Sequence, residues 1–297
     1  MKKEFSRVDF NDQISRNKWK SFFLMLIIFF VIVLFGWVIS NALDPGYFFI
    51  IMIFSIIFSI SYLLISYYNS DKIALASVSA KEASRTEHKQ LYNLVEGLTI
   101  ASGLPMPKLY IMKSENINAF ASGRNPENSV ICVTTGSLTK LDKRELEAVL
   151  SHELSHIANY DIRYITLVAV MVGMISIISQ IFLRSLWFSN MGGGKNDKNK
   201  AIFILIGIIL AILAPIAVYF VQMAISRKRE FSSDASAVKF TRYPNGLISA
   251  LEKIQKENYP EKKVSKAIAP LFFSNPFKGM GSTHPSLEKR IEVLRRM

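Results

Sequence analysis

Cysteine and histidine are scarce in this chain of 297 residues, which has one cysteine and four histidines. With Cys132 alone, no disulfide can form within one chain and no cysteine-based metal cluster can be built. Cys132 lies in the apolar run Val130-Ile131-Cys132-Val133, so we expect a small core residue rather than a nucleophile. Because histidines are so few, the position of each is informative: His88, His152, His156 and His284.

Acidic residues are also few, 23 against 36 basic ones, and the formal net charge is +13. No block of lysine and arginine resembles a nucleic-acid-binding arm, and no aromatic-basic RNA motif occurs, so nucleic acid is not an expected partner. Half of the residues are hydrophobic, and they are concentrated in long runs. We therefore expect the basic residues to flank membrane spans and to face an anionic lipid bilayer.

Four apolar runs are long enough to cross a bilayer, which needs about 20 residues. They cover roughly residues 21–40, 46–67, 162–183 and 201–225. The first run is too long and too aromatic for a signal peptide, and a turn-forming segment follows it instead of a cleavage site. The sequence therefore predicts two transmembrane hairpins. Basic residues before the first run predict cytoplasmic termini, although the basic loop 184–200 would then face outward against the usual bias.

The expected domain organisation alternates membrane hairpins with pieces of one soluble domain. Residues 1–68 hold an N-terminal segment and the first hairpin, and residues 162–225 hold the second hairpin. Residues 69–161 and 226–297 form the soluble part. Its predicted elements are helices at 73–102, 142–159, 226–240, 245–256 and 285–296, with strands at 108–112, 118–121 and 129–134.

His152 and His156 are four residues apart on a predicted helix that begins with the capping-box pair Asp142 and Glu145. This spacing puts both imidazoles on one face, about one turn apart, where they can bind one metal ion, and two neutral nitrogens suit zinc. Glu153 lies about 100° around the helix and can act as a general base on a metal-activated water. The alternative, a surface helix with two solvated histidines, is disfavoured by the helical context of the motif.

A catalytic zinc usually has three protein ligands and one open position. Glu230 is the expected third ligand, and Asp234, on the same helical face, is expected to accept a hydrogen bond from a ligating imidazole. His156 precedes the third apolar run by six residues and Glu230 follows the fourth by five, so a hairpin would bring them together near the membrane. Without the histidine pair, these two carboxylates would be interpreted as a solvated helix face.

Other interpretations stay open on the residues alone. His284, just before a proline, could be a fourth ligand, an oxyanion donor or a surface residue. The run Asn118-Ala119-Phe120 could be an edge strand that pairs with an extended substrate, or a plain sheet strand. A closed four-ligand site would indicate a membrane scaffold with structural zinc, and a transporter would need more polar residues within the spans than the sequence has.

The sequence resembles the HtpX heat-shock proteases, membrane members of the peptidase family that also contains the Ste24-type CaaX proteases. The matching runs are Gly103–Lys108, Asn118–Pro126, Thr134–Gly136, His152–Asp161, Arg229-Glu230 with Asp234, Ser282–Pro285 and Arg290-Ile291. The resemblance implies one zinc per chain, bound by His152, His156 and Glu230, with Glu153 as general base. Ser232-Ser233 stands where the family usually has an aromatic residue and alanine, which leaves the detailed shape of the cleft open.

The resemblance also implies roles for residues outside the zinc motif. Asp234 would orient His152, the strand Asn118, Ala119 and Phe120 would border the substrate cleft, and His284 and Arg290 would line it. We accordingly count His284 with Glu153 among the catalytic residues.

The implied fold is a mainly α membrane protein. Four transmembrane helices would carry a cytoplasmic α+β zincin-like metalloprotease domain with a small three-stranded sheet. The implied function is that of a multi-pass metalloendopeptidase of the cell membrane. It would cleave misfolded or damaged membrane proteins, or unfolded polypeptides, at the cytoplasmic face during stress. Ste24-like peptide processing is the alternative, and homo-oligomer formation is left open.

Overall fold

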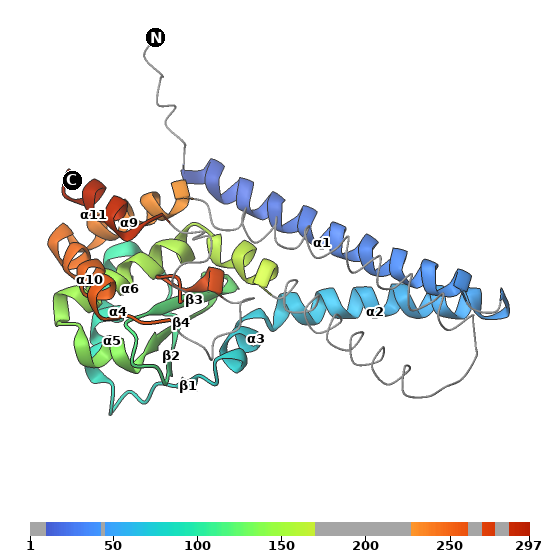
Figure 1. Cartoon of the computed structure of the whole chain (residues 1–297), viewed down its shortest axis with the longest axis horizontal. Coiled ribbons are helices and arrows are strands. Elements are labelled where there is room, and N and C mark those ends of the chain that lie inside the picture. The colour runs from blue at the N-terminus through green and yellow to red at the C-terminus, as the bar shows by residue number, and fades with distance from the viewer. Residues whose placement is uncertain (1–9, 43–44, 170–226, 261–268, 277–284) are drawn as a thin grey trace, which may run out of the picture.

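The computed structural model describes residues 10–42, 45–169, 227–260, 269–276 and 285–297. Figure 1 shows two long helices that extend away from a mixed domain of helices and one sheet. The elements are α1 (Phe10–Ala42), η1 (Pro45–Tyr47), α2 (Phe48–Tyr68), α3 (Ser70–Ser77), β1 (Lys81–Glu82), α4 (Lys89–Ser102), β2 (Lys108–Met112), β3 (Ala119–Asn125), β4 (Asn128–Thr134), α5 (Thr135–Lys140), α6 (Lys143–Ala158), α9 (Arg227–Thr241), α10 (Pro244–Glu257), η2 (Ala269–Leu271) and α11 (Leu287–Leu294).

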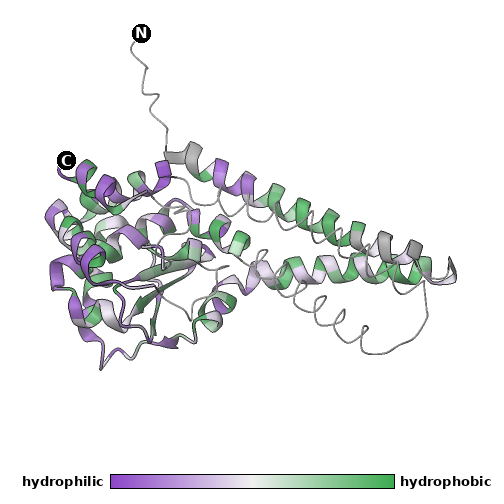
Figure 2. Cartoon of the chain, viewed as in Figure 1, coloured by the Kyte–Doolittle hydropathy of each residue, from purple (hydrophilic) through white to green (hydrophobic). Residues whose placement is uncertain are grey.

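Helices α1 and α2 form the first predicted hairpin. Both contain a stretch long and apolar enough to cross a membrane, Ile14–Leu34 and Phe48–Tyr68, and α1 is hydrophilic near its start and hydrophobic beyond it (Figure 2). The helices approach closely at Gly36, where a Cβ atom would lie 1.9 Å from Ser55 Oγ. Such small-residue contacts are typical of membrane helix pairs. The third and fourth predicted spans fall mostly on residues 170–226, outside the described residues; within them, residues 162–169 are described and are helical.

Among the described residues, the sheet has four strands in the order β1-β2-β4-β3. The prediction of three strands was therefore wrong, because it missed β1. β2 and β4 are parallel, and the other two pairs are antiparallel. The three predicted strands are confirmed in position. The additional strand, β1, has only two residues and is therefore too short to give an alternating pattern.

The single helix predicted over residues 73–102 is wrong, because the chain forms α3, then β1, then α4 in this range. Ser77 Oγ donates a hydrogen bond to Ala74 O at 2.6 Å, and Ser79 has a positive φ of 52°. Short polar side chains that bond to nearby main chain compete with helix formation. A left-handed residue then ends the helix, so hydrophobic periodicity alone overestimated its length.

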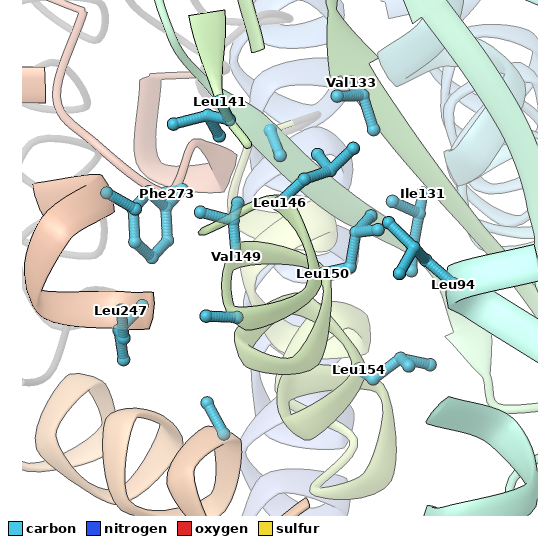
Figure 3. Close-up of a cluster of buried hydrophobic side chains, with 14 of the residues drawn as sticks. Leu94, Ile131, Val133, Leu141, Leu146, Val149, Leu150, Leu154, Leu247 and Phe273 are labelled. Atoms are coloured by element: carbon cyan, nitrogen blue, oxygen red, sulfur yellow. The ribbon is translucent and has the colours of Figure 1, made fainter. Parts of the chain in front are cut away.

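The helix predicted over residues 142–159 is confirmed as α6, which carries the His152 motif. Glu145 N donates to Asp142 Oδ1 at 2.9 Å and Asp142 N donates to Glu145 Oε2 at 2.8 Å, which confirms the capping box. Figure 3 shows its apolar face, Leu146, Val149, Leu150 and Leu154, within the hydrophobic cluster. The helix contacts β3, α4, α9 and α10. The metal motif therefore lies on a helix whose residues around His152 are buried.

Cys132 lies on β4 and is fully buried, which confirms its prediction as a core residue. Burial raises the pKa of its thiol far above the ordinary range, because the thiolate would lose its hydration. The thiol is therefore unreactive in the folded chain.

Candidate metal centre

Helices α6 and α9 bring His152, His156 and Glu230 together at one buried point. One ligand atom from each lies within 4.8 Å of the others. The two Nε2 atoms are 3.2 Å apart. Glu230 Oε2 lies 3.7 Å from His152 Nε2, and Glu230 Oε1 lies 3.6 Å from His156 Nε2. The structure thus groups the three residues that the sequence and the resemblance indicated as metal ligands.

The three residues fit a metal ion by geometry and by chemistry. Ligands bound tetrahedrally to zinc at about 2.05 Å are separated from one another by about 3.3 Å. The observed separations of 3.2, 3.6 and 3.7 Å are close to this value. When each imidazole carries its proton on Nδ1, the two Nε2 lone pairs face one another, and a cation between them relieves their repulsion. Two histidines and a carboxylate also form a common donor set for catalytic zinc.

Each histidine contacts a buried carboxylate through its other ring nitrogen. His152 Nδ1 lies 2.9 Å from Asp234 Oδ1, and His156 Nδ1 lies 3.0 Å from Asp161 Oδ2. Such pairs hold the proton on Nδ1, so that the Nε2 lone pair faces the metal. The contact of Asp234 with His152 agrees with the expectation for Asp234. The role of Asp161 was not predicted.

Arg290 of α11 supports His152 through Asp234. Its Nε and Nη2 donate to the two Asp234 oxygens at 2.9 and 2.6 Å, and all three side chains are fully buried. Burial alone would raise the pKa of Asp234, but Arg290 and His152 outweigh burial and hold this pKa below its usual range. Burial alone would likewise lower the pKa of His152, yet hydrogen bonds to Asp234 and Glu230 raise it to about 9.

Glu153 is 1% exposed and lies beside β3. Burial raises its pKa, although the neighbouring histidines and a hydrogen bond with the Ala121 backbone favour the ionised form. Among the described residues, its Oε1 atom has no hydrogen-bond partner. A buried carboxylate oxygen without a partner, next to metal ligands, is suited to accept a proton from a water molecule.

The turn after α6 places Asp161 behind His156. Tyr160 has a φ of 57°, a left-handed conformation that separates α6 from the helical residues that begin at Asp161. Asp161 is fully buried, and its Oδ1 accepts from Asn17 Nδ2 at 2.7 Å and contacts Arg229 Nη1 at 3.4 Å. Ser233, one of the departures from the family pattern, lies with its Oγ 3.2 Å from His156 Nδ1.

The sequence analysis did not predict the contacts that Asp161 and Asn17 make. Asp161 follows the motif helix closely, so its position five residues after His156 was a usable signal. Asn17 is an amide near the start of a helix whose later residues are apolar, and a polar side chain at such a position usually has a partner. Because α1 begins at Phe10, Asn17 lies on the membrane helix rather than before it, as the predicted span 21–40 had implied.

Of the remaining predicted site residues, four are described, and all four are buried. Asn118, Ala119 and Phe120 are buried at β3. The Asn118 side chain donates to Ser274 O at 2.8 Å and accepts from Ser274 N at 3.1 Å. Arg290 lies behind His152 rather than on an open surface. His284 lies outside the described residues.

Comparisons with known proteins place the chain in a family. The model of peptidase family M48 matches residues 84–297. The chain is 41% identical over 292 residues to a "Protease HtpX homolog" from Dictyoglomus thermophilum, which covers 97% of this chain and 95% of the relative. It is 42% identical over 281 residues to a relative of the same name from Caldanaerobacter subterraneus, with 93% and 91% covered. A relative of that name from Listeria monocytogenes is 37% identical over 302 residues, with 96% and 99% covered.

Among solved structures, the crystal structure of S. mikatae Ste24p superposes with a TM-score of 0.48 at 20% identity. The match covers 95% of this chain and 66% of that chain. At this level of similarity it adds nothing to the assignment of the site.

The metal assignment predicts that zinc binding requires the two buried histidines. The purified chain should bind about one zinc ion, and the double variant His152→Ala/His156→Ala should bind none, because a single carboxylate remains. His88→Ala is the matched control, since His88 precedes α4 and is not in the ligand group. Metal content after dialysis measures the effect. Normal zinc binding by the double variant would refute the site.

Proposed function

The chain belongs to peptidase family M48 and is a membrane metalloprotease, and we propose that its metal is a single zinc ion held by His152, His156 and Glu230. The observation that supports this most directly is the convergence of the three ligands beside Glu153. Two nitrogens and one carboxylate leave a position open for water or substrate, as catalytic zinc requires. Membership in a peptidase family removes the alternative of a membrane scaffold with structural zinc.

We propose that Glu153 is the general base. Bound zinc would polarise the scissile carbonyl and acidify the attacking water. The free Oε1 of Glu153 takes the proton of that water and later delivers it to the leaving amine. The raised pKa of this buried carboxyl group makes it a better proton carrier than an exposed glutamate. Asp234 and Asp161 keep the two imidazoles oriented throughout. His284, which the resemblance places in the cleft, is proposed as a further catalytic residue.

The general-base role predicts that Glu153→Gln loses activity but keeps its metal. The amide cannot accept the water proton, so peptide cleavage should fall by about 10²- to 10⁴-fold, with zinc content unchanged. Glu147→Gln is the matched control, because Glu147 lies on the same helix and pairs with Arg144 instead. Cleavage of an unfolded protein by both variants measures the effect. Near-normal cleavage by Glu153→Gln would contradict the mechanism.

We propose that the substrate main chain lies along β3 at Ala121–Gly123. The preceding residues already have a partner, since Phe273 N donates to Ala119 O at 2.8 Å and Phe120 forms an antiparallel bridge with Phe272. By strand alternation, the main-chain groups of Ala121 and Gly123 face the same edge as those of Ala119. Ala121 also adjoins Glu153. In this proposal Asn118, Ala119 and Phe120 border the substrate strand.

Strand pairing predicts a periodic response to backbone methylation of a peptide substrate. Removing an N–H that donates to β3 should lower kcat/KM by about fivefold, the equivalent of one hydrogen bond, whereas methylation at the intervening positions should change it little. The measurement is kcat/KM for a series of singly N-methylated peptides. A uniform response along the peptide would contradict strand pairing.

We further propose a multi-pass arrangement in the cell membrane with a cytoplasmic active site. The protease domain would consist of residues 69–161 and 226–297, divided by the second hairpin at 162–225. At the end of α2, Arg124 and Arg163 lie 4.7 and 5.0 Å from the ring centroids of Tyr68 and Tyr67. Paired basic and aromatic side chains suit the headgroup level of an anionic bilayer. Misfolded membrane proteins and unfolded polypeptides are the proposed substrates, and Ste24-like peptide processing is the alternative.

The topology predicts opposite labelling of two introduced cysteines. In intact cells an impermeant thiol reagent should label Ser189→Cys in the outer loop, but should label Lys113→Cys, which is exposed on the protease domain, only after permeabilisation. The unaltered chain is the control, because buried Cys132 should not react. Labelling of both positions from the same side would refute the four-span arrangement.

A further inference from the structure

Asn17 of α1 reaches the turn that follows the metal-binding helix. Its side chain is 2% exposed. Its Nδ2 donates to Asp161 Oδ1 at 2.7 Å and to Asn159 O at 3.0 Å, which uses both amide hydrogens. The adjacent Lys18 Nζ lies 4.5 Å from the centroid of the Tyr160 ring. Helix α1 therefore contacts all three residues of this turn.

The turn determines how His156 is held. Asp161 Oδ2 contacts His156 Nδ1 at 3.0 Å, and Asp161 Oδ1 bonds Asn17. The same carboxylate therefore joins a metal ligand to a membrane helix. The guanidinium of Arg229 lies 3.4 Å from Oδ1, a longer contact than that of Asn17. The left-handed Tyr160 makes the turn costly in itself, so its geometry depends on surrounding contacts.

We propose that Asn17 is a positioning residue of the metal centre: it fixes Asp161 and thereby the orientation of His156. Asn17 lies outside residues 84–297, which the family model matches, so the first membrane helix would be part of the active-site support. An amide in an apolar helix is costly unless it is hydrogen-bonded, and here both of its donors are used in this turn. The proposal rests on the zinc site proposed above.

Removal of the amide has a defined consequence. Among the described residues, Asp161 Oδ1 would keep the longer Arg229 contact, and Asn159 O would lose its Asn17 donor. The carboxylate and the imidazole it orients would then sample more orientations, so metal binding would lose preorganisation. Loss of a direct partner of a metal ligand typically costs 10- to 100-fold in affinity. Because Asn17 acts one step further away, we expect about a tenfold loss.

The test measures zinc affinity of the full chain in detergent micelles by competition with a chelator. Asn17→Leu keeps the branched shape and removes both donors, and its apolar side chain suits a membrane helix. Asn17→Ala removes the amide without adding bulk. Asn69→Leu is the matched control, because Asn69 follows the other hairpin helix and its side chain donates to Ile65 O of that helix, away from the metal centre. Asp161→Asn and the combined variant Asn17→Leu/Asp161→Asn form a double-mutant cycle with Asn17→Leu and the unaltered chain.

The expected result is about tenfold weaker zinc binding in both Asn17 variants, unchanged binding in Asn69→Leu, and an altered visible spectrum of the cobalt-substituted protein. If Asn17 acts through Asp161, the combined variant should bind no more weakly than Asp161→Asn alone. Affinity within twofold of the unaltered chain with an unchanged cobalt spectrum would overturn the proposal, as would fully additive losses.

Two further outcomes are also decisive. If both Asn17 variants fail to fold while Asn69→Leu folds, Asn17 serves the fold rather than the metal, and the proposal is wrong. If the His152→Ala/His156→Ala chain binds zinc normally in the same assay, the zinc site itself is wrong. Failure of the site is thereby distinguished from failure of the role given to Asn17.

Discussion

The buried ion pair between Asp234 and Arg290 connects the parts of the protease domain that form the active site. Asp234 contacts His152, and Arg290 donates to Phe273 O at 3.1 Å, so a metal ligand, the segment beside β3 and helix α11 meet at one pair of charges. Removing one partner of such a pair leaves an uncompensated buried charge, at a cost of about 3–5 kcal/mol. The last helix of the chain is therefore needed for the geometry of a site whose metal motif lies more than 130 residues earlier.

The two histidines of α6 are supported from opposite parts of the chain. His152 is oriented by α9 and α11, whereas His156 is oriented by the turn after its own helix and, through Asp161, by α1. Both supports are carboxylates, and each carboxylate has its own donors. In the proposed site, both Nε2 atoms therefore point toward the metal position only when α11 and α1 are packed against α6 and the turn that follows it. In this arrangement, metal binding depends on assembly of the whole chain.

The features that the sequence predicted correctly are those carried by local pattern. The capping box, the apolar face of α6 and the spacing of His152 and His156 all involve residues within one helix. Glu230 lies beside the two histidines, but its choice depended on a hairpin that falls outside the described residues, and its role as a ligand stays a prediction. The bond between Asn17 and Asp161 joins residues 144 positions apart, which no periodicity reports. The break between α3 and α4 depends on competing serine hydrogen bonds, and Arg290 was expected at the cleft although the structure buries it behind His152.

The burial of β3 restricts which substrates could pair with it in the proposed mechanism. The edge of this strand is occupied at Phe120 by the antiparallel segment around Phe272, and Ala121 and Gly123 beyond it are buried. A substrate that pairs there must present one extended chain, because a folded surface cannot bring its main chain to a buried strand. Folded proteins keep their main-chain groups paired internally, so they would be excluded by this requirement. Unfolded segments beside the membrane hairpin would satisfy it, and selection for misfolded chains would then follow from strand geometry without a separate recognition site.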